Sequence, residues 1–183
     1  MFKSTVLPAI RNMKDFEKAL ESNHETIILL ETRVSQLQAM VKYLHKHEKK
    51  VFVHADLIHG LRADKYGVEF LLNNAKVDGV ISTRNEVISI VKKQRIVAIQ
   101  RLFVLDSQAL NHNLEMCKRV NPDYIEVLPA ILPGIIKEVH EETGIPIIAG
   151  GLIRTEQHVE EAIRNGAVAV TTSTKQLWDT SKD

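Results

Sequence analysis

The chain has 183 residues, which is enough for one compact domain with a substantial hydrophobic core. The 24 Lys and Arg nearly balance the 23 Asp and Glu, so the net charge of +1 argues against a protein that coats nucleic acids or membranes by electrostatic attraction alone. The start of the sequence has no apolar leader, and its longest apolar stretch, residues 130–136, is interrupted by Pro133 and too short to span a bilayer.

The single cysteine, Cys117, excludes an internal disulfide and a zinc site made of cysteines. It falls in a helical pattern with Leu110 and Leu114, which favours a buried thiol. A chain with these features is expected to work in the cytoplasm.

Short apolar runs alternate with longer helical patterns along the whole chain. The runs are apolar on both faces, which is typical of parallel strands covered by helices on one side and by a core on the other. Eight such runs are expected to form strands: residues 6–9, 26–30, 51–55, 78–81, 96–99, 124–128, 146–149 and 168–170.

The helical segments between the runs carry recognisable end signals. Ser35 is expected to cap a helix, and Ser107 and Thr155 precede two further amphipathic patterns. Pro133 suits a first helical turn, and Gly144 is expected to end that helix before the next strand. No linker or charge shift divides the chain, so residues 1–179 are expected to form one domain and residues 180–183 a loose tail.

The repeated β–α units predict a closed parallel (β/α)8 barrel of the TIM type. Such barrels usually contain about 250 residues, so this one would be minimal. The alternative is an open, doubly wound sheet, but that architecture rarely uses so many units in so short a chain. We therefore expect an α/β fold with a minimal TIM-type barrel.

Polar residues follow the strands at their C-terminal ends. Strand ends become polar simply on leaving a core, which accounts for residues such as Thr83. His54, Asp56, Gln100 and Glu126 are different, because each lies within or directly after an apolar run, where an unpaired polar group is costly. In a barrel these ends meet at one rim, which is where such folds bind ligands.

The clearest pattern is Gly150-Gly151 at the end of the seventh run, followed by Thr172-Ser173 after the eighth. Glycines let a ligand approach backbone N–H groups, and small hydroxyl residues at the start of a short helix add donors and a positive helix end. The loops after strands seven and eight are the usual phosphate site of this fold. The ligand is therefore expected to be a small phosphorylated molecule.

Catalysis and metal binding have weaker support at this rim. His54 and Asp56 can be read as an acid–base pair or as metal ligands, with Glu126 as a third ligand, but residues two apart on a strand share a face without either chemistry. No lysine ends a strand, so a Schiff base lacks its nucleophile. The site is better equipped to hold a ligand whose hydroxyl groups contact Asp56 and Glu126. We therefore expect no metal, no cofactor and no catalytic residue.

Basic residues gather near the C-termini of the expected helices, which point to the opposite, N-terminal rim. Such residues offset the negative end of a helix or simply face solvent. Three clusters on one rim also offer a local surface for structured RNA. The candidates for RNA contact are Lys49, Lys50, Lys92, Lys93, Lys118 and Arg119. The arginines that follow the strands are the alternative: Arg33, Arg62, Arg84, Arg101 and Arg154.

Seven short strings in a fixed order carry a resemblance to a known family. They are LPAIRN at 7–12, HADLIHG at 54–60, ISTR at 81–84, IQRLFVLD at 99–106, IEVLP at 125–129, AGGLIR at 149–154 and VTTS at 170–173. From about Leu7 to Trp178, the chain resembles the bacterial glycerol-uptake operon antiterminator family. The resemblance implies a cytoplasmic regulator with a barrel fold that responds to glycerol 3-phosphate and acts on the untranslated leader of glycerol-catabolic messenger RNA.

The resemblance also implies which residues form the site. The phosphate would bind Gly150, Gly151, Thr172 and Ser173, and the polar rim would comprise His54, Asp56, Gln100, Arg101 and Glu126. Two departures stand out: Ala130 occupies a position where a glycine is expected, and residues 31–33 are less typical. The resemblance does not locate the RNA surface.

Two functions from different classes remain. The favoured one is a glycerol 3-phosphate-responsive transcription antiterminator that binds leader RNA, with glycerol 3-phosphate as effector and no cofactor. The alternative is a TIM-barrel epimerase or isomerase acting on a small sugar phosphate, with His54, Asp56 and Glu126 as acid–base or metal groups. No membrane partner is expected, and the sequence leaves the oligomeric state open, a homo-oligomer included.

Overall fold

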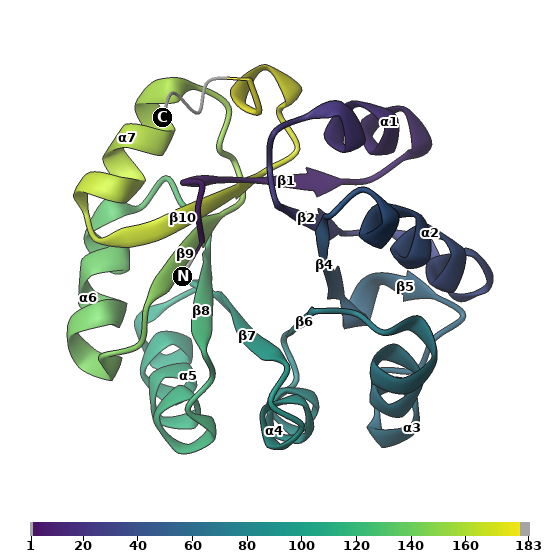
Figure 1. Ribbon diagram of the computed structural model, residues 1–183. Helices are drawn as coiled ribbons and strands as arrows, with labels where there is room; N and C mark the ends of the chain where they lie inside the picture. The colour runs from purple at the N-terminus through teal and green to yellow at the C-terminus, as the bar shows by residue number, and fades with distance from the viewer. Residues whose placement is uncertain (1, 180–183) are drawn as a thin grey trace.

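Eight parallel strands close into a barrel in the computed structural model, which describes residues 2–179 (Figure 1). This confirms the expected α/β fold with a single TIM-type barrel. The loose tail expected at residues 180–183 lies outside the described residues. Around the barrel the strands are β1 (Val6–Ile10), β2 (Thr26–Leu29), β4 (Lys50–His54), β6 (Gly79–Ser82), β7 (Val97–Phe103), β8 (Tyr124–Leu128), β9 (Ile147–Gly150) and β10 (Ala167–Thr172), which pairs with β1.

Helices follow the strands and surround the barrel. They are α1 (Met13–Glu21), α2 (Val34–Lys46), α3 (Lys65–Glu69), which continues as the π-helix η2 (Phe70–Ala75), α4 (Asn85–Lys93), α5 (Ser107–Val120), α6 (Pro133–Thr143) and α7 (Glu156–Arg164). The last unit ends in a short 3-10 helix, η3 (Lys175–Leu177), and another such turn, η1 (Ala55–Leu57), follows β4. None of the helices among residues 2–179 is long and apolar enough to cross a membrane.

Most of the expected helix ends are confirmed. Helix α5 begins at Ser107 and α6 at Pro133, and α6 ends before Gly144, whose φ of 67° is a left-handed conformation that glycine adopts without steric cost. The Thr155 hydroxyl accepts a hydrogen bond from the His158 amide at 3.2 Å and caps α7.

The expected cap at Ser35 is wrong, because α2 begins one residue earlier, at Val34. Its neighbours Thr32–Arg33 form a short strand, β3, that pairs with β5 (Ile58–His59) in a two-stranded ribbon outside the barrel. The chain turns from this ribbon directly into α2, so Ser35 lies inside the first turn of the helix.

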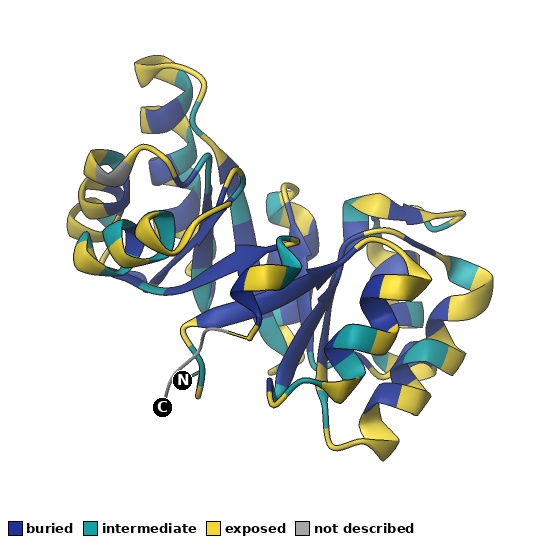
Figure 2. Cartoon of the chain, turned by 90° about the horizontal axis from the view of Figure 1, so that it is seen from above, coloured by how far each residue is buried: buried dark blue, intermediate teal, exposed yellow. Residues whose placement is uncertain are grey.

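Along each strand, successive side chains point alternately into two apolar layers, because side chains two residues apart share a face. One set fills the barrel interior: Leu7, Ala9, Ile28, Leu30, Phe52, Ile81, Ile99, Ile148 and Ala169. The other set packs under the helices, whose outer faces are exposed (Figure 2). Cys117 belongs to this outer layer, is buried as expected, and burial raises the pKa of its thiol to about 11.

Aromatic rings pack together at the N-terminal end of the interior, where they line a cavity of about 240 Å³. Phe2 lies across the end of the barrel, with its ring centroid 5.9 Å from that of Phe52 and 4.9 Å from that of Tyr124. At the C-terminal end the interior positions become polar, and barrels of this type bind their ligands at that rim.

Candidate functional site

A cavity of about 260 Å³ opens at the C-terminal rim of the barrel, and we call it the rim cavity. It lies where the loops after several strands converge, as expected for this fold. Its lining consists of Ala9, Arg11, Leu30, Leu57, Arg101, Glu126, Leu128, Gly151, Leu152, Ile153, Arg154 and residues 171–174. Five of the residues assigned to ligand binding from the sequence are among them: Arg101, Glu126, Gly151, Thr172 and Ser173.

A buried ion pair lines the rim cavity. Glu126 on β8 is 1% exposed, and Arg101 on β7 is 10% exposed. The Arg101 Nε donates to Glu126 Oε2 at 2.7 Å, and the Thr171 hydroxyl donates to Glu126 Oε1 at 2.7 Å. Both carboxylate oxygens therefore have protein partners, and Glu126 is held in one orientation.

The loop after β9 has an unusual backbone. Gly151 and Leu152 both adopt left-handed conformations, with φ of 75° and 61°. For Leu152 this conformation is strained, and such strain concentrates at functional sites. The backbone amide of Ala130 donates to the Gly150 carbonyl at 2.7 Å, which joins the loop after β8 to the end of β9.

Gly150 and Gly151 have different roles in the structure. A Cβ on Gly150 would lie 2.7 Å from Thr171 Oγ1 and 2.8 Å from Glu126 Oε1. Gly150 is therefore required for close packing against the ion pair, and it does not line the cavity, whereas Gly151 does.

The end of β10 and the loop after it are rich in hydroxyl groups. The hydroxyls of Thr172 and Thr174 both donate to the Ile153 carbonyl, at 2.8 and 3.0 Å, which ties this loop to the one after β9. Ser173, between them, is exposed to the cavity. The helix that follows, η3, has only three residues, so its dipole contributes little and an anion here depends on individual donors and charges.

The charges around the rim cavity favour an anion. Among the described residues, Arg11, Arg101 and Arg154 line it against a single carboxylate, Glu126. Sequence reasoning did not assign Arg11 or Thr171 to ligand binding, although both continue the inward-facing pattern of their strands: Arg11 is two residues after Ala9, and Thr171 is two residues after Ala169.

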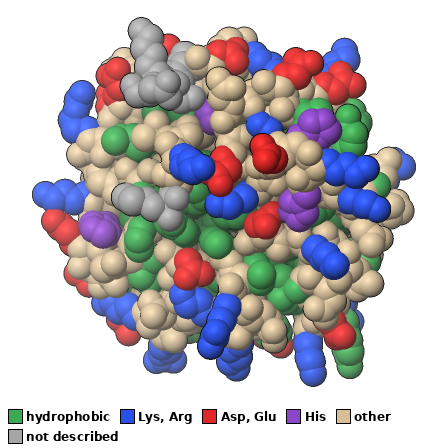
Figure 3. Space-filling view, viewed as in Figure 1, with side chains coloured by type: hydrophobic (Ala, Val, Ile, Leu, Met, Phe, Trp, Pro, Cys, Tyr) green, Lys and Arg blue, Asp and Glu red, His purple; other side chains and the backbone are tan. Residues whose placement is uncertain are grey.

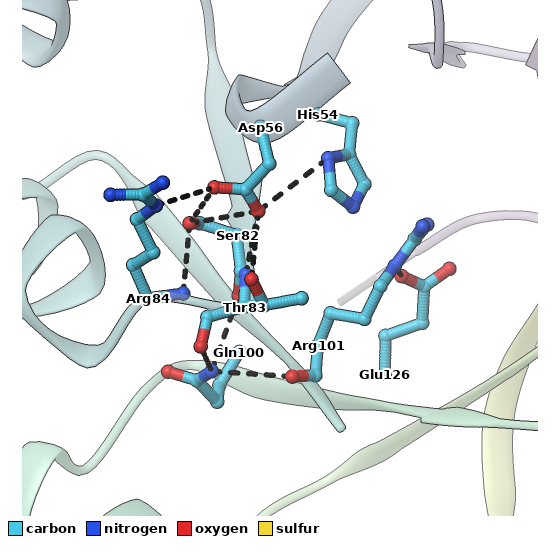
Figure 4. Close-up of polar contacts among 8 residues, drawn as sticks. All are labelled: His54, Asp56, Ser82, Thr83, Arg84, Gln100, Arg101 and Glu126. Carbon is cyan, nitrogen blue, oxygen red and sulfur yellow. Dashed lines mark hydrogen bonds and ion pairs between the residues drawn. The ribbon is translucent and has the colours of Figure 1, made fainter. Parts of the chain in front are cut away.

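Asp56 and Gln100 have structural partners outside the rim cavity (Figure 4). Asp56 accepts hydrogen bonds from the Ser82 hydroxyl at 2.9 Å and from the Thr83 amide at 2.8 Å, which joins the loops after β4 and β6. The Gln100 side chain follows the outward-facing pattern of β7, and its amide nitrogen donates to the carbonyls of Ser82 and Thr83.

His54 lies in the barrel interior and is 2% exposed. Among the described residues neither of its ring nitrogens makes a hydrogen bond, and its Nδ1 is 3.8 Å from Asp56 Oδ2 (Figure 4). Burial and the nearby positive charge of Arg101 lower the pKa of His54 to about 4, against the opposing influence of Glu126 and Asp56. The ring is therefore neutral at pH 7. His54 is also absent from the lining of the rim cavity.

No group of three or more His, Cys, Asp or Glu side chains in residues 2–179 could hold a metal ion. The carboxylates of Glu126 and Asp56 are both committed to protein donors instead.

The basic residues proposed for RNA contact lie near the opposite rim, where positive and negative side chains are interspersed (Figure 3). Four of the six have protein partners. Lys49 donates to the backbone carbonyls of Ser22 and His24, and burial lowers its pKa. The other three form ion pairs: Lys50 with Glu25, Lys92 with Asp123 and Lys118 with Glu142. Of the six, only Lys93 and Arg119 make no side-chain ion pair or hydrogen bond with the described residues.

Comparison with known proteins places this site in a family. A family model described as "Glycerol-3-phosphate responsive antiterminator" matches residues 6–178. The structure is similar to that of a glycerol uptake operon antiterminator regulatory protein from Listeria monocytogenes, with 45% identity and a TM-score of 0.95 over 97% of this chain and 96% of that one. It is also similar to a glycerol uptake operon antiterminator-related protein from Thermotoga maritima, with 29% identity and a TM-score of 0.85 over 97% of this chain and 99% of that one.

A curated relative, the uncharacterized protein YgcP of Escherichia coli, is 29% identical over 180 residues, which are 98% of this chain and 94% of that protein. The family match covers every strand of the barrel and every loop of the rim cavity. The chain belongs to the glycerol-3-phosphate responsive antiterminator family.

Proposed function

We propose that this protein senses glycerol 3-phosphate in its rim cavity and controls transcription antitermination by binding the untranslated leader of glycerol-catabolic messenger RNA. The observation that carries the proposal is the cavity itself, where three arginines and a row of hydroxyl groups surround one buried carboxylate. A small anion with hydroxyl groups matches that lining in both charge and hydrogen bonding.

The two ends of glycerol 3-phosphate have different partners in this proposal. The phosphate lies between the loops after β9 and β10, near Gly151 and Ser173, where Arg11 and Arg154 offset its charge. The glycerol hydroxyls face the Arg101–Glu126 pair. Gly150 supports this arrangement through packing, and Thr172 by holding the loop after β9.

The proposal is for binding without turnover. An epimerase or isomerase needs an acid and a base that reach the substrate. The one carboxylate in the lining, Glu126, has both oxygens bonded, and His54 and Asp56 are not part of the lining. Incubation with small sugar phosphates and Mg²⁺ is expected to give no isomerised or epimerised product, and product formation would favour the enzyme instead.

The regulatory proposal is tested by titrating purified protein with the leader RNA, with and without glycerol 3-phosphate. The ligand is expected to change the affinity for RNA by at least about fivefold, a typical lower limit of allosteric coupling. RNA binding that is absent in both conditions, or equal in both, contradicts the proposal. The proposed setting is the cytoplasm, with glycerol 3-phosphate as effector, the leader RNA as partner, and no cofactor or membrane involved.

A further inference from the structure

A second cavity, of about 200 Å³, lies beside the rim cavity. It is formed by the start of α1, the loop after β2, the β3–β5 ribbon and the first turns of α2. Its lining consists of Ile10, Arg11, Asn12, Met13, Glu31, Thr32, Arg33, Gln36, Met40 and His59. Of residues 2–179, Arg11 alone lines both cavities.

The β3–β5 ribbon shapes this second cavity. Arg33 of β3 is paired in register with His59 of β5, which places the two residues next to each other. Helix α2 begins directly after Arg33, so Gln36 and Met40 lie one turn apart on the same face of the helix. The Thr32 hydroxyl lies 3.3 Å from the Met40 sulfur and joins the ribbon to the helix.

The polar groups of the second cavity are largely uncommitted. The Arg33 side chain is exposed and makes no ion pair or hydrogen bond with the described residues. Arg11 pairs only with Glu31, at 3.6 Å, and both side chains are exposed, so this pair is weak. Asn12 is the exception, because its side chain bonds to Asp15 and caps α1.

This set of side chains matches one unpaired nucleotide. Arginine binds phosphate and stacks on bases, while Gln36 and His59 offer donors and acceptors for a base edge. Met13 and Met40 add adaptable, polarisable surfaces that a base can contact. Sequence-specific RNA recognition acts mostly on single-stranded nucleotides of this kind.

We infer that the second cavity binds an unpaired nucleotide of the leader RNA, and that Arg11 couples this cavity to the ligand in the rim cavity. The inference rests on the proposed function and adds the location of the RNA contact. A phosphate in the rim cavity is a stronger partner for Arg11 than the long, exposed contact with Glu31. Ligand binding therefore changes the charge that Arg11 presents to the second cavity, and by linkage RNA changes the affinity for ligand by the same factor.

The site is tested by measuring the binding of leader RNA to Arg33→Ala. Arg33 lines the second cavity but not the rim cavity. In Arg33→Ala the RNA affinity is therefore expected to fall about tenfold, and the slope of its salt dependence by about one. The stabilisation by glycerol 3-phosphate is expected to be unchanged. The matched control is Arg164→Ala, an exposed arginine in the last turn of α7 outside both cavities, which is expected to change the RNA affinity by less than about twofold.

The coupling is tested with Arg11→Gln at saturating glycerol 3-phosphate. The affinity for RNA is expected to become independent of the ligand, although the variant still unfolds cooperatively. A ligand effect equal to that of the unchanged protein contradicts the role of Arg11.

The remaining outcomes separate this inference from the proposed function. If the unchanged protein does not bind leader RNA, the proposed function fails and the inference with it. If the unchanged protein binds and Arg33→Ala binds equally well, only the inference fails. It also fails if the double variant Lys93→Glu, Arg119→Glu loses RNA binding while Arg33→Ala keeps it, because the RNA then docks on the opposite rim.

Discussion

Glu126 organises the inner end of the rim cavity, because both of its oxygens are bonded and its charge offsets that of Arg101. Replacing it with Gln keeps the shape but leaves a guanidinium that is 10% exposed without its counter-charge. We expect Glu126→Gln to lower the free energy of unfolding by about 3 kcal/mol, measured by urea denaturation.

The matched control is Glu31→Gln, because Glu31 also pairs with an arginine of the cavity lining. That pair is 3.6 Å long, with side chains 59% and 44% exposed, so its loss is expected to cost less than about 1 kcal/mol. Equal effects of the two substitutions would show that burial of the Arg101–Glu126 pair does not determine its contribution to the free energy of unfolding.

His54 gives the protein a specific pH dependence. Its folded-state pKa of about 4 lies below the unfolded value of about 6.5, so the unfolded state binds the proton more readily. The contribution of neutral His54 to the free energy of unfolding is fully present above about pH 6.5. It is lost as the pH falls from there through 4, with a slope approaching 1.4 kcal/mol per pH unit. In His54→Gln the free energy of unfolding is expected to fall less between pH 6.5 and 4.5 than in the unchanged protein. Parallel pH profiles would contradict this assignment.

The site residues show which sequence signals transfer to the structure. Inward-facing positions at the ends of strands place Glu126 and Arg101 in the lining of the rim cavity, because a polar residue there has only the cavity or a partner to face. Gln100 was predicted for the same rim but follows the outward pattern of β7 and bonds to backbone carbonyls. The alternation of inward and outward side chains along β1 also predicts that Arg11 faces the cavity. The partners of Asp56, in contrast, depend on loops whose shape no local sequence pattern specifies.

At the scale of elements, helix starts differ in what holds them. The Thr155 side chain caps α7 by accepting from the His158 amide, while Ser35 lies one residue inside α2 and caps nothing. We expect Thr155→Ala to lower the free energy of unfolding by about 1 kcal/mol and Ser35→Ala to change it by less than about 0.5 kcal/mol. A loss at Ser35 as large as that at Thr155 would mean that Ser35 caps α2 in solution.

The eight barrel strands were predictable because each is a continuous apolar run between helical patterns. The β3–β5 ribbon was not, because each of its strands has only two residues and neither shows periodicity. The π-helix η2, which continues α3, could not be predicted either, because the extra residue in a helical turn leaves no mark in composition.

At the scale of the whole molecule, the two rims of the barrel have different kinds of charge. Near the N-terminal rim most of the basic residues proposed for RNA contact pair with acids or carbonyls at the ends of other elements, and these contacts stabilise the barrel. At the C-terminal rim, arginines surround two adjacent cavities. The sequence contains both sets, but only the folded chain shows which charges are already neutralised.

Ligand binding to the folded barrel is expected to stabilise the whole molecule. At about 100 times its dissociation constant, glycerol 3-phosphate adds about 2.7 kcal/mol, which corresponds to a rise in Tm of roughly 5–11 °C for a domain of this size. Glycerol at the same concentration is expected to give no measurable rise, because the phosphate supplies most of the attraction to the arginines of the rim cavity.

Gly151→Val is expected to abolish the rise in Tm that glycerol 3-phosphate causes, relative to the variant without ligand. The φ of 75° at Gly151 disfavours any side chain, and a Cβ there would lie 3.3 Å from Leu128. Differential scanning calorimetry measures the Tm with glycerol 3-phosphate, with glycerol and in Gly151→Val. Equal shifts from glycerol and glycerol 3-phosphate would contradict a phosphate site in the rim cavity.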